Sequence, residues 1–260
     1  MELSLNGLRV LVTGSSRGIG YGIANAYLEE GAFVVLTGRD EDKLNQARAC
    51  LVEKYGANRI DSHAGDLCDR VVRGSLLDLL ASKGLDSLVC NIGSGKSVPA
   101  MQETDEEWRR MLDINLVHAA GLVKELHSLL AASVKQGRNA SVTFIGSICG
   151  MESLGCPIPY ASAKAALWAY TKSLVGPLAK DGIRVNMVSP GNILFSGSTW
   201  ESKLAENEAK VQEMVKREVP LCRFGTVKEV SAAVVFLASQ KSAFITGANL
   251  VIDGGQTRGL

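Results

Sequence analysis

The side chains best suited to chemistry in this sequence are a tyrosine and a lysine four residues apart. Tyr160 and Lys164 stand in Tyr-Ala-Ser-Ala-Lys, at the start of a helix expected over residues 160–180, so both side chains lie on one helical face. A phenol with a pKa of ~10 is a poor base at neutral pH, and a nearby ammonium favours the phenolate. The pair is predicted to transfer a proton, as an acid toward a ketone or a base toward an alcohol. Pairs at this spacing are common on helices, so the prediction needs further support.

That support comes from a serine thirteen residues upstream. Ser147 follows an expected strand over residues 141–145, which places its hydroxyl at the carboxyl edge of a sheet, where α/β proteins bind ligands. There it could hydrogen-bond a substrate oxygen and stabilise charge that develops on it. A lone serine at such a place would more often be an ordinary turn residue.

A glycine-rich turn forms a second candidate site near the amino terminus. The expected strand 8–13 runs into Gly14-Ser15-Ser16-Arg17-Gly18-Ile19-Gly20, where a helix over residues 18–30 begins. Unpaired N–H groups at a helix N-terminus favour an anion, and bare glycine backbone can approach a pyrophosphate closely. The alternative is an ordinary βα turn, but the strand–turn–helix context favours dinucleotide binding.

The turn, the serine and the Tyr–Lys pair together resemble the short-chain dehydrogenase/reductase family over nearly the whole chain. The shared motifs are Thr13-Gly14-x-x-x-Gly18-Ile19-Gly20, Ser147, Tyr160-x-x-x-Lys164 and the terminal Asp253-Gly254-Gly255. The branch that the chain is most similar to is the 3-oxoacyl-[acyl-carrier-protein] reductases. The resemblance implies a catalytic set of Ser147, Tyr160, Lys164 and Asn115, in which the asparagine kinks its helix and holds a water that links the lysine to solvent.

The end of the second expected strand, residues 33–37, bears on the choice of cofactor. Enzymes that prefer NAD usually carry an acid there, whereas this chain has Gly38 followed by Arg39, with Arg17 in the glycine loop. Two guanidiniums would bind the 2′-phosphate of NADP(H), although Arg39 could also be a solvated loop charge. Asp40 is interpreted as the N-cap of the next helix. The other cofactor contacts that the resemblance implies are Asp66, Leu67, Asn91, Gly93, Pro190, Gly191 and Ile193, besides Tyr160, Lys164 and the glycine loop from Gly14 to Gly20. Asp66 could equally cap the helix expected from residue 70.

Three positions depart from the family pattern. Cys90 and Ile92 replace the first asparagine and the alanine of Asn-Asn-Ala-Gly, so some bracing of the sheet is expected to be lost. Leu194 or Phe195 stands where the family has a hydroxyl near the carboxamide, for which Ser196 could compensate. None of these changes touches the catalytic set, so they affect cofactor affinity and substrate more than activity.

Short apolar runs alternate with helical stretches from end to end, which predicts one domain over residues 1–260. Near-continuous apolar strands are buried on both faces, so we expect a single doubly wound parallel sheet with helices on both faces. The expected strands are 8–13, 33–37, 59–64, 87–90, 141–145, 183–189 and 249–252. The expected helices are 18–30, 41–55, 70–82, 105–134, 160–180 and 228–239, with capping boxes at Thr104/Glu107 and Thr226/Glu229. The polar stretch 191–216 is predicted to be a substrate lid, in which Phe195, Trp200 and Leu204 could line the pocket.

Composition excludes several classes of function. A formal net charge of +1 without basic blocks gives no sign of nucleic-acid or membrane binding, and there is no leader-like N-terminus. The six scattered cysteines and three histidines have no metal-site spacing, and we expect reduced, mostly buried thiols in a cytoplasmic protein. Ser94-Gly95-Lys96-Ser97 lacks the earlier glycine of a P-loop, because Cys90 stands in its place.

The leading hypothesis is an NADP(H)-dependent ketone reductase of 3-oxoacyl thioesters. The alternatives are a dehydrogenase of a sugar, polyol or other secondary alcohol, and a non-catalytic nucleotide-sensing protein. Apolar residues on the expected helix 105–134 occupy more than the ~100° arc that faces a sheet, which predicts a homodimer or homotetramer.

Overall fold

A seven-stranded parallel sheet forms the centre of the molecule in the computed structural model, which describes residues 2–259. Its strand order is β3-β2-β1-β4-β5-β6-β9, and all six pairings are parallel. The strands are β1 Arg9–Val12, β2 Phe33–Gly38, β3 Ile60–Ala64, β4 Ser87–Cys90, β5 Ala140–Ile145, β6 Ile183–Pro190 and β9 Asn249–Ile252. Each expected strand is present, with its ends displaced by at most one residue, and the predicted fold class is confirmed.

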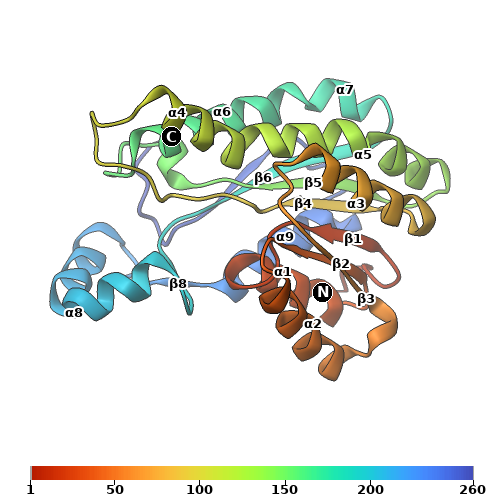
Figure 1. Cartoon of the computed structure of the whole chain (residues 1–260), viewed down its shortest axis with the longest axis horizontal. Coiled ribbons are helices and arrows are strands. Elements are labelled where there is room, and N and C mark those ends of the chain that lie inside the picture. Colours follow the sequence, from red (N-terminus) through yellow and green to blue (C-terminus); the bar gives the residue numbers. More distant parts are fainter. Residues whose placement is uncertain (1, 260) are drawn as a thin grey trace.

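Helices cover both faces of this sheet (Figure 1). On one face lie α1 Gly18–Glu29, α2 Glu41–Tyr55 and α9 Val227–Ala238; on the other lie α3 Arg70–Lys83, α5 His118–Lys135, α6 Ile158–Ser173 and α7 Val175–Ala179. Each face has its own apolar core, with Ile23, Leu44 and Val234 buried in the first and Leu76, Leu126 and Leu167 in the second. Burial on both faces explains why the strands are apolar at successive positions.

The strand order reverses between β1 and β4, and this reversal determines where the ligand-binding crevice lies. Loops that leave the carboxyl ends of neighbouring strands diverge there and leave a crevice that binds ligands. The Thr13 hydroxyl, after β1, accepts hydrogen bonds from the backbone N–H groups of Asn91 and Ile92, after β4. The Asn91 amide returns hydrogen bonds to the carbonyls of Thr13 and Gly14. The two loops that border the crevice are therefore fixed to each other.

The expected helix 105–134 is interrupted. It consists of α4 Asp105–Leu112, a π-helical turn Asp113–Val117 and α5. The expected helix 160–180 likewise divides into α6 and α7 at Leu174. Thr104 caps α4, but Glu107 bonds to Ser97 and Arg110 instead, so that capping box was wrong, whereas the one at Thr226/Glu229 is present.

The stretch predicted as a lid is more regular than its composition suggested. β7 Ile193–Leu194 pairs with β8 Gly225–Thr226. Between them in sequence, α8 Thr199–Glu218 lies to one side of the main body and is kinked at Asn207, whose backbone is not helical (Figure 1). Ser198 starts this helix, because its hydroxyl accepts a hydrogen bond from the Glu201 N–H at 3.1 Å. Three short 3-10 turns complete the secondary structure, at Ala57–Arg59, Ile148–Gly150 and Gln240–Ser242. Among residues 2–259, none of the helices combines the length and the apolar character needed to span a membrane.

Candidate active site

A cleft of about 370 Å³ opens at the carboxyl edge of the sheet and brings together most of the residues singled out from the sequence. Its lining joins the glycine loop, the loop after β4, the end of β5, the start of α6 and the lid. The predicted residues among them are Gly14, Arg17, Gly18, Ile19, Asn91, Gly93, Ser147, Tyr160, Lys164, Pro190, Gly191, Ile193, Phe195 and Trp200. Leu204, which we expected to line the pocket, is not among the lining residues.

Ser147, Tyr160 and Lys164 meet in this cleft as predicted. Ser147 follows β5 in an extended conformation, and its Oγ accepts a hydrogen bond from the Cys149 N–H at 3.2 Å. Lys164 is only 4% exposed; its Nζ lies 5.9 Å from the centre of the Tyr160 ring and donates to the Ile145 carbonyl at 2.9 Å. The lysine is thus anchored beneath the tyrosine by the last residue of β5.

Burial sets the protonation of both groups. It raises the pKa of Tyr160, and a hydrogen bond with Ser147 opposes that rise. The pKa of Lys164 falls to about 8, because burial penalises the ammonium. We expected the lysine to lower the pKa of Tyr160, and that expectation was wrong, because burial raises this pKa. The phenol is therefore protonated at neutral pH, while the Lys164 ammonium donates to the Ile145 carbonyl.

Asn115 lies directly behind this pair, at the middle of the π-helical turn. Its side chain is 1% exposed, and its Nδ2 donates to the carbonyls of Met111 and Ser94 at 3.0 and 3.1 Å. A Cβ placed on Gly93 would lie 2.8 Å from Asn115 Oδ1 and 3.0 Å from Lys164 Nζ. The three residues therefore converge, and the interruption of the helix coincides with the asparagine as the resemblance implied.

The glycine loop has the close approach that its sequence predicted. A Cβ at Gly20 would come within 2.3 Å of the Gly14 carbonyl oxygen, and Gly14 itself has a φ of +63°. Ser15 is fully buried and serves the fold, because its Oγ donates to the Val12 carbonyl and accepts from the Thr37 N–H. Arg17 donates to the carbonyl of Gly197 at 3.0 Å, which ties the loop to the lid.

The residues expected around the adenosine lie together at the rim, outside the cleft lining. Ser16 packs beside Gly38, whose added Cβ would be 3.2 Å from the Ser16 Oγ. The exposed Arg39 guanidinium lies 3.7 Å from the Asp66 carboxylate. Asp66 accepts from the Cys68 N–H in a turn, and Asp69 is the N-cap of α3, so the alternative role of Asp66 as that cap was wrong. The Leu67 side chain is fully buried.

The three departures from the family pattern are accommodated. Cys90 is buried in the sheet, and the Asn91 amide braces the end of β1. Ile92 covers Gly14, and the Phe195 ring covers Gly18. Ser198 and Thr199, but not Ser196, line the cleft beside Phe195, and the Ser198 hydroxyl accepts hydrogen bonds from the Phe195 and Glu201 N–H groups.

Our expectation of reduced, mostly buried thiols was wrong. Cys149 and Cys156 form a disulfide, which closes the segment between Ser147 and Tyr160. Of the others in the described chain, Cys50, Cys68 and Cys222 are exposed and Cys90 alone is buried. The pair is seven residues apart in sequence, a spacing that carries no disulfide signature.

One buried residue near the site escaped sequence analysis. His118, 2% exposed, begins α5, and its Nδ1 lies 3.0 Å from the Asp113 carbonyl within the π-helical turn. Burial lowers its pKa to about 4, so it is neutral at neutral pH. A single histidine in a helical stretch gives no sequence signal that its ring is buried and neutral.

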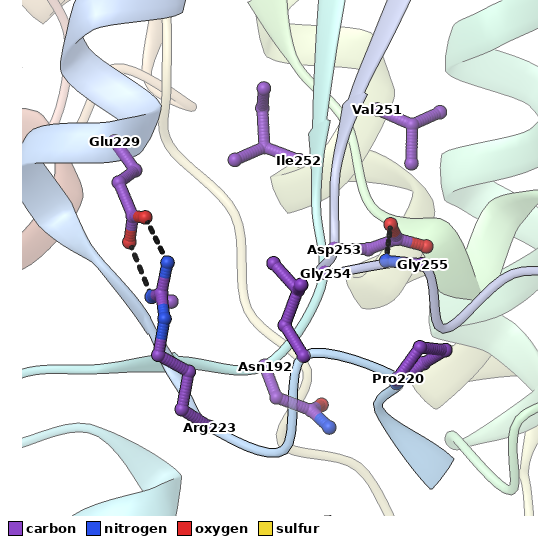
Figure 2. A pocket seen from close by; sticks show the side chains of 11 residues that line it. Asn192, Pro220, Arg223, Glu229, Val251, Ile252, Asp253, Gly254 and Gly255 are labelled. Carbon is purple, nitrogen blue, oxygen red and sulfur yellow. Dashed lines mark hydrogen bonds and ion pairs between the residues drawn. The ribbon is translucent and has the colours of Figure 1, made fainter.

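A second hollow, of about 510 Å³, lies at the carboxyl end of β9 (Figure 2). Its charged groups are bonded to one another or to backbone: Arg223 to Glu229 through two hydrogen bonds, and Asp253 to the Gly255 N–H. It contains none of the predicted catalytic residues. Within residues 2–259 no cluster of His, Cys, Asp or Glu could hold a metal ion.

Sequence comparison adds independent evidence. A family model described as enoyl-(acyl carrier protein) reductase matches residues 14–257. A 3-oxoacyl-[acyl-carrier-protein] reductase of Chlamydia pneumoniae is 34% identical over 261 residues, covering 99% of this chain and all of that protein. A tropinone reductase homolog of Arabidopsis thaliana is 34% identical over 260 residues, covering 98% and 94%.

Solved structures agree. The L-sorbose reductase of Gluconobacter frateurii, complexed with NADPH and L-sorbose, superposes with a TM-score of 0.92 at 30% identity and full coverage of both chains. A 3-oxoacyl (acyl-carrier-protein) reductase of Agrobacterium tumefaciens C58 with NADP bound gives a TM-score of 0.88 at 25% identity, covering 98% of this chain and 96% of that one.

Proposed function

Because the chain belongs to the short-chain dehydrogenase/reductase family, and is an oxidoreductase of CH–OH and C=O groups, we propose that it reduces a ketone to a secondary alcohol with NADPH. The observation that carries this proposal is the convergence of Ser147, Tyr160 and Lys164 in one cleft with the glycine loop. A non-catalytic nucleotide-sensing role is disfavoured, because the catalytic set has no missing member.

The residues present fit NADP(H). Gly14 and Gly18, with φ values of +63° and +57°, shape the turn at the N-terminus of α1, whose backbone N–H groups would hold the pyrophosphate. Arg17 and Arg39 would bind the 2′-phosphate, since the end of β2 at Gly38 carries no acid. Asp66 and Leu67 would contact the adenine, while Asn91, Gly93, Pro190, Gly191 and Ile193 would border the nicotinamide half. When bound, the cofactor supplies the hydride.

The side chains of the protein then donate and replace the proton that the reduction consumes. The buried, protonated Tyr160 is suited to donate its phenolic proton to the carbonyl oxygen as negative charge develops there. Ser147 would donate a hydrogen bond to the same oxygen, because its Oγ accepts from the Cys149 N–H and its hydroxyl proton is left to be donated. Lys164 and Asn115 would replace the proton from solvent. A protonated phenol is the form of Tyr160 that reduction requires.

For the substrate we propose a 3-oxoacyl thioester, supported by the similarity to 3-oxoacyl-[acyl-carrier-protein] reductases over nearly the whole chain. A sugar or polyol is the second candidate, favoured by the structural similarity to the L-sorbose reductase. The lid, residues 191–216, would cover either one, with Trp200 and Phe195 facing the cleft. A panel of 3-oxoacyl thioesters, ketoses and cyclic ketones, scored by NADPH oxidation, tests the choice.

We also propose that the protein assembles as a homodimer or homotetramer in the cytoplasm. Val117 is 52% exposed on the interrupted helix, and Trp108, Leu112 and Leu116 are only partly buried. A second copy of the same helices could cover this apolar surface in a closed two-fold arrangement. Sedimentation at micromolar concentration tests the proposal, and an active monomer would contradict it.

A further inference from the structure

The segment Ser94–Ser97, which follows β4, has no role in the mechanism above. Its sequence suggested a P-loop but lacks the required glycine. The structure places Ser94, Gly95 and Lys96 in the lining of the same cleft as Tyr160. A Cβ added at Gly95 would lie 3.8 Å from the Tyr160 ring, so the segment packs against the reacting phenol.

The backbone of this segment is held at several points. The Ser94 N–H and carbonyl both bond to the Asn115 amide, and the Lys96 N–H donates to Ser94 Oγ at 3.2 Å. Arg110 donates to the Lys96 carbonyl at 2.9 Å. The Lys96 side chain, in contrast, is exposed, and within residues 2–259 its ammonium has no hydrogen bond or ion pair. A fixed backbone thus presents a cation without a partner.

The charges around the cleft point to what this cation binds. Three basic residues line it, Arg17, Lys96 and Lys164, while none of the lining residues is acidic. Arg17, in the glycine loop, donates to the Gly197 carbonyl of the lid, and Lys164 is buried against Ile145. Of the three, only the Lys96 side chain has no partner among the described residues, so it is the one available to bind the substrate. A cleft lined by charge of one sign concentrates ligands of the opposite sign.

We propose that Lys96 binds an anionic group of the substrate, a phosphate or carboxylate, located several atoms from the carbonyl that is reduced beside Tyr160. This inference rests on the proposed function and narrows its substrate class. The phosphate of a phosphopantetheine arm has this chemistry, and so does that of a sugar phosphate. A neutral ketone without such a group would gain nothing from Lys96.

Two pairs of matched substrates, one charged and one neutral in each pair, distinguish a phosphopantetheine arm from a sugar phosphate. One pair is a 3-oxoacyl thioester of pantetheine 4′-phosphate against the same thioester of pantetheine, and the other is a ketose phosphate against the free ketose. The measured quantity is the ratio of kcat/KM for the charged member to that for the neutral member. In the Lys96→Ala variant this ratio should fall about five- to tenfold for whichever pair carries the true anion, as expected for one charge-assisted contact.

Two further variants sharpen the test. Lys96→Arg should keep most of the ratio, and Lys96→Glu should lower it further by repulsion. The matched control is Lys135→Ala, an exposed lysine at the end of α5, which should leave the ratio unchanged. Added salt should reduce the wild-type ratio and have little effect in Lys96→Ala. A fall confined to the pantetheine pair identifies the carrier arm, and a fall confined to the ketose pair identifies a sugar phosphate.

The proposal is overturned if Lys96→Ala lowers kcat/KM equally for charged and neutral substrates, or leaves both unchanged. If the wild type reduces neither pair, the proposed substrate classes fail, and equilibrium binding decides the separate question of Lys96. Pantetheine 4′-phosphate and a ketose phosphate are then titrated into the NADP⁺-loaded protein. At least one should bind about fivefold or more tightly to wild type than to Lys96→Ala, and equal affinities for both would reject the inference.

Discussion

The carboxamide of Asn115 holds the backbone of Ser94 from both sides. Its Oδ1 accepts a hydrogen bond from the Ser94 N–H at 3.0 Å, and its Nδ2 donates to the Ser94 carbonyl at 3.1 Å. A further bond from Nδ2 to the Met111 carbonyl connects this clasp to the preceding turn of helix. One buried side chain thus joins the interrupted helix to the loop that borders Tyr160 and Lys164.

Replacing this asparagine should harm both stability and catalysis. Asn115→Ala leaves the Ser94 backbone groups without partners, which costs about 1–3 kcal/mol for each group that stays buried. We expect chemical denaturation to show a loss of about 2 kcal/mol, and kcat to fall at least about tenfold. Asn45→Ala, at an exposed position of α2, is the control. An Asn115→Ala enzyme with normal kcat would show that the clasp has no catalytic role.

Activity should decline as pH rises through the pKa of Lys164. Burial lowers that pKa to about 8, so the ammonium needed to supply the proton is lost above this pH. We expect kcat/KM for reduction to fall about tenfold per pH unit beyond it. Lys164→Arg, which stays charged, should lack this limb even if its overall rate is low.

Deprotonation of Lys164 does not itself destabilise the fold. The folded-state pKa of Lys164 lies below the ordinary value of 10.5, so between the two the unfolded chain binds more protons and this group's contribution to stability rises with pH. Denaturation at pH 8 and pH 9.5 in parallel with the rates checks this. A pH profile that is flat across this range would contradict the assigned role of Lys164.

Cofactor preference should depend on Arg39. The protein should bind NADPH at least tenfold more tightly than NADH, a difference of ~1.4 kcal/mol. Arg39→Ala should weaken NADPH and leave NADH nearly unchanged, because only the 2′-phosphate distinguishes the two. Fluorescence titration measures both affinities, with the exposed Arg109→Ala on α4 as control. Equal weakening of both cofactors would mean that Arg39 is structural.

The Cys149–Cys156 disulfide should stabilise the fold. It closes a short loop, for which chain entropy gives about 2 kcal/mol, and Cys149 also donates its N–H to Ser147. Cys149→Ala/Cys156→Ala should therefore lower the free energy of unfolding by about that amount. Alkylation of the denatured, unreduced protein should label the four free cysteines, Cys50, Cys68, Cys90 and Cys222. Labelling of all six would show that the bond is absent.

Local sequence patterns predicted the strands and the catalytic edge well, because apolar runs and glycine turns depend on neighbouring residues alone. The break around Asn115 was visible only through the family resemblance, since the apolar pattern continues through Ile114, Leu116 and Val117. The raised pKa of Tyr160 and the neutrality of His118 depend on burial by segments distant in sequence. No periodicity reveals such contacts, nor the approach of Cys149 to Cys156.

The central claim is that Tyr160 donates the proton in an NADPH-dependent reduction, and one comparison tests it most directly. On a substrate that the wild type reduces, NADPH oxidation is followed for wild type and Tyr160→Phe, and the NADPH affinity of each is measured. We predict that kcat falls at least about 100-fold in the variant, with NADPH affinity within about threefold of wild type, because only the transferable proton is removed. Near-full turnover by Tyr160→Phe would contradict the account.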